Sequence, residues 1–241
     1  MRTIIAFIFL LLFFVISLPL MLIALLVGLF SMKARDLFML RFVQFGLRTL
    51  HRIAGAKITV NGLENIPKDE AVLFMGNHIS YFDVIITYPL MRRPTGFIAK
   101  KEIKKIPILD WIMYFVRCLF LDREDPRAGL QMVLTAADYI KDGISIVIFP
   151  EGTRSKDGKL ADFKEGSFKI ATKSKCSIIP FGVVGTPELF ETHSPWLKPA
   201  KVSITFGKPI PTKDLDRSQQ RALSSLVRAE VAKLSGQELA D

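Results

Sequence analysis

The sequence contains few residues that could build a disulfide framework or a metal centre. Among its 241 residues are only two cysteines, Cys118 and Cys176, and three histidines. The cysteines stand far apart and in no CxxC spacing, which argues against both a disulfide scaffold and a structural zinc site. We therefore expect a fold held together by its hydrophobic core, with no metal.

Signatures of several common enzyme classes are also missing. The chain has no G-x-S-x-G elbow. The stretch from Gly152 to Leu160 departs from a phosphate loop, because its second glycine is one place late and leucine replaces the final Ser or Thr. The net charge of +10 favours anionic partners. The basic residues are spread out and form no recognition motif, so nucleic acid is not an expected partner.

Charged side chains are absent from residues 4–30, and this run accounts for much of the positive mean hydropathy of +0.32. As a helix this run would measure roughly 40 Å, whereas the hydrocarbon core of a bilayer is about 30 Å thick and needs about 20 residues. A cleaved signal peptide fits poorly, because the run is too long and no A-x-A-like site follows. We predict a membrane anchor that either spans the bilayer or bends at Pro19 and inserts from one side.

Basic residues follow the apolar run more densely than they precede it. Only Arg2 comes before it, so the positive-inside rule leaves the rest of the chain at the cytoplasmic face of the inner membrane. In residues 36–52, arginines and leucines separate onto opposite sides of a predicted helix. This basic amphipathic helix would lie on anionic membrane lipid, pack its apolar side on the following domain, or do both.

From residue 56 onward, short strand-like runs alternate with helical ones. The predicted strands are Lys57–Val60, Ala71–Met75, Phe97–Ala99, Cys118–Leu121, Ile144–Phe149, Ser177–Val184 and Val202–Phe206. The predicted helices between them are Val84–Leu90, Ile108–Val116, Pro126–Lys141 and Ser167–Lys175. This alternation predicts an α/β fold with a single mixed or largely parallel sheet flanked by helices.

The same pattern divides the chain into three parts. Residues 1–55 form the hydrophobic anchor and the basic helix, residues 56–212 the α/β domain, and residues 213–241 a C-terminal helical segment.

One histidine stands where active sites of α/β folds commonly lie. His78 directly follows an apolar strand, and Asp83 comes five residues later. Asp83 could fix the tautomer of the imidazole and leave its other nitrogen free to take a proton. Alternatively, Ser80 and Asp83 form a capping box that only starts a helix. A serine hydrolase built from Ser80, His78 and Asp83 is disfavoured, because residues two apart rarely achieve triad geometry.

A second polar loop, Phe149-Pro150-Glu151-Gly152-Thr153-Arg154-Ser155, also follows a strand. A glycine turn exposes backbone N–H groups, and the planar fork of Arg154 suits a phosphate. Glu151 could accept a hydroxyl or orient Arg154. The alternative is an ordinary polar loop with an internal ion pair.

These motifs resemble those of the glycerolipid acyltransferase family, in particular its bacterial 1-acyl-sn-glycerol-3-phosphate acyltransferases. The family's H-x-x-x-x-D box stands here as His78 to Asp83, and F-P-E-G-T-R is intact as Phe149 to Arg154. A block ending in an I-D-R-like triplet matches Phe120 to Arg123, and a short apolar stretch with a proline matches Ile178 to Phe181. The resemblance covers residues 56–210. It departs at Arg117-Cys118, where the family usually has a glycine.

The resemblance implies that an acyl group passes from acyl-CoA or acyl-carrier protein to the 2-hydroxyl of lysophosphatidate, making phosphatidate. His78 and Asp83 would be the catalytic pair, with His78 as general base. The residues implied to hold the substrate are Lys105, Arg123, Glu151, Gly152, Thr153 and Arg154. Gly152 and Thr153 would do so through their backbone N–H groups. The acyl thioester is a co-substrate, and no cofactor is expected. Another lysolipid as acceptor, or a non-catalytic lipid-binding protein, would be the alternatives.

Overall fold

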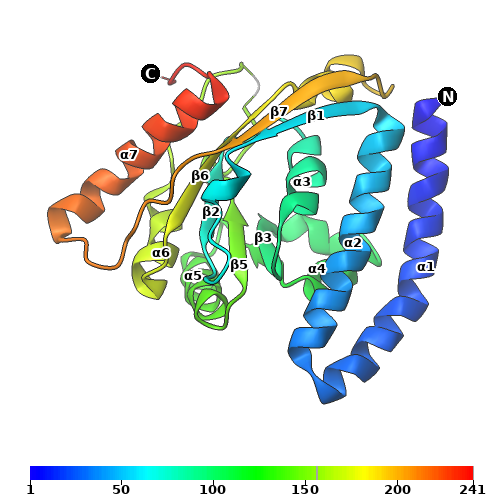
Figure 1. Cartoon of the computed structure of the whole chain (residues 1–241), viewed down its shortest axis with the longest axis horizontal. Coiled ribbons are helices and arrows are strands. Elements are labelled where there is room, and N and C mark those ends of the chain that lie inside the picture. The colour runs from blue at the N-terminus through cyan, green and yellow to red at the C-terminus, as the bar shows by residue number, and fades with distance from the viewer. Residues whose placement is uncertain (156, 241) are drawn as a thin grey trace.

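The computed structural model describes residues 1–155 and 157–240. Seven strands form one sheet in the order β1-β7-β6-β2-β5-β3-β4 (Figure 1). Their bounds are β1 Ala56–Asn61, β2 Leu73–Gly76, β3 Thr95–Lys100, β4 Leu119–Leu121, β5 Ser145–Ile148, β6 Ile178–Val184 and β7 Ala200–Phe206. Neighbouring strands run parallel, except β6 and β7. The predicted single, largely parallel sheet is confirmed.

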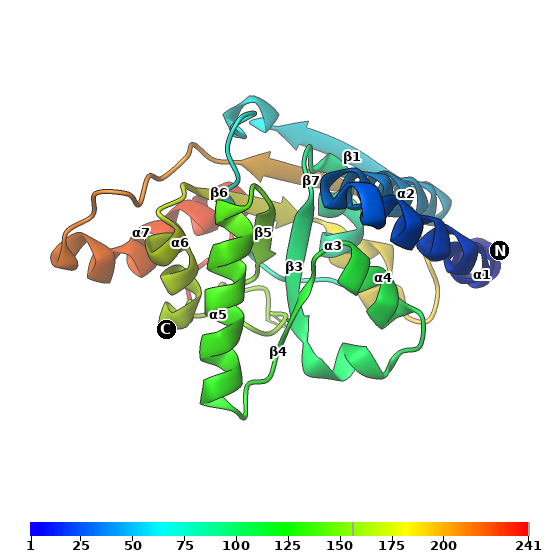
Figure 2. The same cartoon turned by 90° about the horizontal axis from the view of Figure 1, so that it is seen from below.

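Helices cover both faces of this sheet (Figure 2). Their bounds are α1 Arg2–Phe30, α2 Met32–Ala54, α3 Phe82–Thr87, α4 Leu109–Phe115, α5 Pro126–Lys141, α6 Phe168–Ser174 and α7 Arg217–Ser235. The side chain of Asp125 caps α5, and that of Asp216 closes a capping box on α7. Residue 241, the last of the predicted C-terminal segment, lies outside the described residues. The division into three parts stays a prediction.

The strands at the centre of the sheet bury side chains on both faces. In β2, Phe74 points to one core while Leu73 and Met75 point to the other. The first core is completed by residues of α1, α2, α3 and α4, and the second by residues of α5, α6 and α7. This double burial explains why the strands appear in the sequence as nearly continuous apolar runs.

The helices α1 and α2 lie side by side as an antiparallel hairpin at one edge of the molecule (Figure 1). Phe13 of α1 stacks on Phe42 of α2, with ring centroids 4.6 Å apart. A Cβ on Gly46 would come within 2.2 Å of the Phe13 ring, so this glycine permits the close approach. The helix α1 continues through Pro19 without interruption.

The beginning of α1 is held against the body of the protein. Arg2 Nη1 donates to the carbonyl of Ile53 at 2.7 Å, and the hydroxyl of Thr3 accepts the N–H of Leu197 at 2.9 Å. The start of α1 therefore lies beside the end of α2 rather than projecting away from the body.

The apolar side of α2 belongs to the core, as one of the two interpretations of residues 36–52 predicted. Leu40 and Val43 are buried there, while Arg41 and Arg52 are exposed. The guanidinium of Arg48 donates to the carbonyl of Pro89 at 2.9 Å. Contact of the exposed arginines with lipid stays a prediction.

Most of α1 presents apolar side chains to the surface. It is the one helix among the described residues that is long and apolar enough to cross a membrane. Large side chains such as Phe7, Leu11, Leu22 and Leu26 are more than half exposed. An apolar surface of this extent is costly in water, and it indicates that the protein associates with a membrane.

Arg117, at the departure from the family pattern, has the backbone conformation that favours glycine. Its φ is +61°, which a side chain adopts at a cost. Arg117 Nε donates to Asp36 Oδ2 at 2.8 Å, and its guanidinium lies over the ring of Tyr139. Asp36 also pairs with Arg35. These contacts offset the strain and join the start of α2 to the end of α4.

Candidate active site

Five parallel strands end at one edge of the sheet, and the predicted site residues follow them. His78 comes after β2, Glu151 and Arg154 after β5, and Arg123 after β4. Because the carboxyl ends of parallel strands meet at one edge, residues far apart in the sequence come together there.

Asp83 stabilises the turn between β2 and α3 and also contacts the imidazole of His78. Its Oδ2 lies 2.8 Å from His78 Nδ1 and accepts the N–H groups of Ile79 and Ser80 at 2.7 and 2.8 Å. Its Oδ1 accepts the hydroxyl of Thr186 at 2.6 Å. Asp83 is fully buried. One carboxylate therefore pairs with His78 and also accepts the N–H of Ser80 ahead of α3. The alternative capping box is not closed, because the N-cap of α3 is Tyr81 and the Ser80 hydroxyl accepts the N–H of Phe82.

The imidazole of His78 is oriented on two sides. Its ring stacks on Phe149, with centroids 4.2 Å apart and planes 13° from parallel. Asp83 accepts at Nδ1, which puts the hydrogen there and leaves the lone pair on Nε2. In the described residues Nε2 has no hydrogen-bond partner, and the side chain is 21% exposed. The geometry suits a general base that faces a substrate.

Ser80 is engaged elsewhere. Its hydroxyl donates to Glu191 Oε2 at 2.8 Å and accepts the N–H of Phe82. No hydrogen bond joins it to His78 within the described parts of the chain. The arrangement of a serine hydrolase is not formed.

Glu151 ties the two motif turns together. Its Oε1 accepts the N–H of His78 at 2.8 Å, and its Oε2 accepts the N–H of Ala161 at 3.1 Å. Burial raises the pKa of the Glu151 carboxyl above its ordinary value, although the two N–H donors oppose this. The expectation that Glu151 orients Arg154 was wrong, since Arg154 pairs with a different carboxylate. A contact between Glu151 and substrate stays a prediction.

The turn at Gly152 uses a backbone donor of its own. Gly152 has a φ of +76°, and its N–H donates to the carbonyl of Phe149 at 2.9 Å. This donor is used by the turn itself, and a contact between Gly152 and substrate stays a prediction. The N–H of Thr153 has no acceptor among the described residues and remains a candidate. Arg123 donates to the carbonyl of Gly152, which brings the second predicted cation to this loop.

The carboxylate that orients Arg154 is Glu191, a residue that no motif in the sequence indicated. Arg154 Nη1 lies 3.3 Å from Glu191 Oε1, and the guanidinium carbon lies 3.7 Å from the centre of the Tyr81 ring. Glu191 belongs to the 3-10 turn Glu191–His193, between β6 and β7. No periodicity or motif marks this loop, so only the folded arrangement reveals it.

Lys105 is exposed at the end of the 3-10 turn that follows β3, and no described contact links it to the other site residues. Its role stays a prediction. No group of three metal-ligating side chains occurs among residues 1–155 and 157–240.

The C-terminal segment contacts the turn before His78 and the loop after β5. Asn77, fully buried next to His78, exchanges hydrogen bonds with the backbone of Val183 and donates to Gln237 Oε1 at 2.7 Å. Gln237 Nε2 donates in turn to the carbonyl of Gly158. The segment after α7 therefore bridges the histidine turn and the loop after β5.

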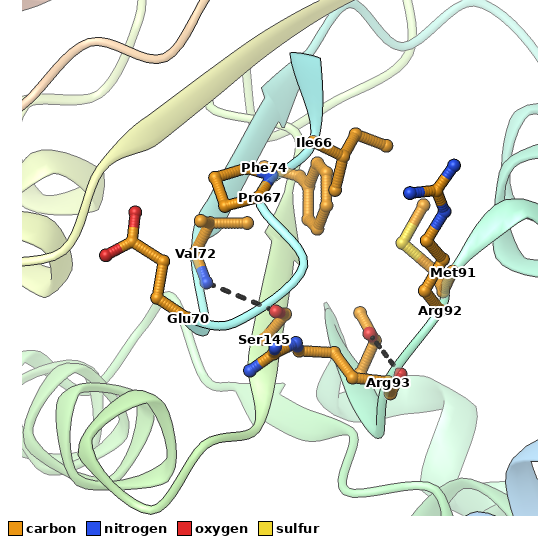
Figure 3. Close-up of a pocket in the computed structure, with 10 residues that line it drawn as sticks. Ile66, Pro67, Glu70, Val72, Phe74, Met91, Arg92, Arg93 and Ser145 are labelled. Carbon is orange, nitrogen blue, oxygen red and sulfur yellow. Dashed lines mark hydrogen bonds between the residues drawn. The ribbon is translucent and has the colours of Figure 1, made fainter. Parts of the chain in front are cut away.

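The two described cavities lie away from His78. One, of about 10 Å³, lies at the amino edge of the sheet between Val72, Thr95 and Ser145 (Figure 3). It has room for one water at most. The other, of about 590 Å³, is an open cleft between α4, β4 and α5, lined by Trp111, Phe120 and other residues. Neither cavity is lined by His78 or Asp83.

Comparison with known proteins gives consistent matches. The family model described as Acyltransferase matches residues 57–184. A protein of Borreliella burgdorferi named 1-acyl-sn-glycerol-3-phosphate acyltransferase is 33% identical over 181 residues, 75% of this chain and 72% of its own length. A Chlamydomonas reinhardtii protein of the same name is 34% identical over 177 residues, 70% of this chain. The present chain spans about half the length of that protein.

A solved structure matches nearly the whole chain. The crystal structure of the 1-acyl-sn-glycerophosphate (LPA) acyltransferase PlsC from Thermotoga maritima superposes with a TM-score of 0.75 at 26% identity. The match covers 97% of this chain and 98% of that one. The match therefore includes the α1–α2 hairpin and the C-terminal segment as well as the sheet.

Proposed function

Because the chain belongs to the acyltransferase family, we propose that it transfers a fatty acyl group from an acyl thioester to the 2-hydroxyl of 1-acyl-sn-glycerol-3-phosphate, making phosphatidate. The observation that carries this proposal is the pairing of His78 with buried Asp83 at the same sheet edge as Arg154. A base and an anion-binding cation are the two groups that acylation of a phosphorylated alcohol needs.

In the proposed reaction, His78 Nε2 takes the proton of the 2-hydroxyl as its oxygen attacks the thioester carbonyl. An ester C–O bond forms and the C–S bond breaks. The leaving thiolate then receives the proton from the imidazolium, which Asp83 stabilises through Nδ1. General-base assistance of this kind contributes about 10²–10⁴ in rate. The thioester is already activated, so no cysteine nucleophile is required.

The acceptor phosphate would bind Arg154, with Arg123 adding positive charge beside the Gly152 turn. The N–H of Thr153 is the backbone donor left for it. The acyl donor would be acyl-CoA or acyl-carrier protein, acting as a co-substrate without a further cofactor.

The protein would work at the cytoplasmic face of the inner membrane, because the basic residues that follow α1 are attracted to the anionic lipids of that leaflet and lysophosphatidate lies in the bilayer. The bonds of Arg2 and Thr3 to the body support insertion of α1 from one side over a transmembrane span. A spanning helix would carry these residues across the bilayer from Ile53 and Leu197. In the proposed arrangement, the exposed apolar side of α1 lies in one leaflet.

The test is acylation by membranes that carry the full chain. Labelled oleoyl-CoA and oleoyl-carrier protein are offered separately with lysophosphatidate or with other lysolipids. His78→Ala should abolish phosphatidate formation, while His193→Ala, in a loop beside Glu188, should leave it unchanged. Acylation of only another lysolipid would replace the named acceptor. A folded, membrane-bound protein that acylates nothing would refute the proposal.

A further inference from the structure

Glu191 contacts both motif turns although it belongs to neither. Its Oε2 accepts the hydroxyl of Ser80 at 2.8 Å, and its Oε1 accepts the N–H of Tyr81 at 2.7 Å. The same Oε1 lies 3.3 Å from Arg154 Nη1. Glu191 also stands beyond residues 57–184, the part that matches the family model.

The guanidinium of Arg154 is held on one face and at one corner. Its carbon lies 3.7 Å from the centre of the Tyr81 ring, and Nη1 is engaged by Glu191. A guanidinium offers two parallel pairs of N–H groups, and the pair on Nε and Nη2 has no acceptor among the described residues. A phosphate accepts such a pair in a bidentate manner.

We propose that Glu191 and Tyr81 preset Arg154 so that its Nε–Nη2 edge faces the phosphate of the acceptor. Glu191 is thus a positioning residue for acceptor binding. This inference rests on the proposed function, in which Arg154 binds that phosphate. A preset side chain loses less conformational freedom when the ligand binds, which favours affinity.

The charge of Glu191 works against this benefit, because a carboxylate beside Arg154 repels a phosphate. The two side chains are 33% and 22% exposed, so water screens much of that repulsion. The bidentate contact, by contrast, needs the guanidinium in one orientation. Orientation should therefore outweigh repulsion. The amide oxygen of Gln can still accept from Arg154 and from the N–H of Tyr81, and its NH2 group can donate to the Ser80 hydroxyl oxygen. Glu191→Gln therefore keeps the positioning without the charge and separates the two effects.

The experiment measures kcat and both KM values of the purified full chain in mixed lipid vesicles with lysophosphatidate and oleoyl-CoA. Glu191→Ala should raise the acceptor KM about tenfold and leave the donor KM unchanged. Glu191→Gln should keep the acceptor KM at or below that of the wild type. The matched control is Glu188→Ala, because Glu188 lies in the same loop and pairs only with His193 in the described structure; it should behave as wild type.

A double-mutant cycle tests whether Glu191 acts through Arg154. In the Arg154→Ala background, Glu191→Ala should cause no further rise in acceptor KM. Tyr81→Leu provides a second route, because Tyr81 is 58% exposed and its ring can be removed without opening the core. This variant should also raise the acceptor KM selectively.

An unchanged acceptor KM in Glu191→Ala, an equal rise in the donor KM, or Glu191→Gln as impaired as Glu191→Ala would each overturn the inference. A full effect in the Arg154→Ala background would overturn it too. These outcomes require an active wild type. A wild type that acylates no lysophosphatidate would instead refute the proposed function, and this inference with it.

Discussion

The backbone N–H of His78 donates to Glu151 Oε1 at 2.8 Å, although the two residues follow different strands. The other carboxylate oxygen of Glu151 holds the N–H of Ala161. One buried side chain therefore sets the position of the histidine turn relative to the loop after β5. The relationship explains why the two turns form one site.

Replacing Glu151 by Gln should impair both folding and activity. An amide presents only one acceptor oxygen, so the N–H of His78 or of Ala161 loses its partner. An unsatisfied buried donor costs about 1–3 kcal/mol. Urea unfolding should show this loss, and kcat should fall as His78 shifts. The exposed Glu165→Gln is the control. Unchanged stability and kcat in Glu151→Gln would contradict the assigned role.

The difference in stability between the wild type and Glu151→Gln should depend on pH. Since burial raises the pKa of Glu151 in the folded state, the folded protein takes up a proton at a higher pH than the unfolded chain does. This group's contribution to stability is present at low pH and is lost as the pH rises through the folded pKa. The wild type should therefore gain stability relative to Glu151→Gln between pH 7 and about 4.5. If the difference in unfolding free energy between the wild type and Glu151→Gln became smaller on acidification, the pKa of Glu151 would not be raised in the folded protein.

Asp83→Asn should reduce kcat by about 10²–10⁴, because the amide cannot stabilise the imidazolium and can hold the wrong tautomer. Thr186→Val removes only the hydrogen bond to Asp83 Oδ1 and should cause a smaller loss. Steady-state kinetics with lysophosphatidate measures both. Equal losses in the two variants would mean that the charge of Asp83 is not the essential feature.

Neither cysteine should react in the native protein. Desolvation of the thiol raises the pKa of Cys118 to about 12, and burial raises the pKa of Cys176 as well. Thiolate, the reactive form, is therefore scarce at pH 8. Iodoacetamide at pH 8 should label both residues only after unfolding, and Cys118→Ala should keep its activity. Inactivation by rapid labelling of native Cys118 would refute the proposed direct transfer.

Charges on the exposed side of α1 should release the protein from membranes. Leu11 and Leu26 are both more than half exposed. We expect Leu11→Lys/Leu26→Lys to sediment less with anionic vesicles than the wild type, since charged groups are costly in hydrocarbon. Leu130→Lys, an equally exposed site on α5, should bind as before. Equal loss from both proteins would indicate general charge effects rather than insertion of α1.

Gly182→Ala should destabilise the fold. A Cβ at this position in β6 would lie 2.4 Å from backbone atoms of Leu234 and Ser235 in α7. Backbone cannot turn away as a side chain can, so overpacking of about 1–3 kcal/mol is expected. Gly166→Ala meets nothing within 4 Å and serves as control. Equal melting temperatures for the two variants would contradict the close approach.

Local patterns in the sequence were sufficient for much of the fold. Each of the seven predicted strands overlaps an observed strand, and Pro126–Lys141 was predicted to the residue. Apolar runs of strand length are buried from both sides, and caps such as Asp125 mark helix starts; both signals are local. The predicted helix Val84–Leu90 starts two residues after the observed start of α3 at Phe82, because Asp83 lies within the first turn of that helix.

The chemistry of the site is already visible in the chain: a histidine and a carboxylate five residues apart, a glycine turn with Arg154, and an apolar run of membrane length. How these groups are used depends on the folded arrangement. It gave Glu151 two backbone donors, committed the N–H of Gly152 to its own turn, and brought Glu191 to Arg154 across 37 residues of chain. Hydrogen-bond partners depend on which strand ends meet, and that meeting leaves no periodic trace in the sequence.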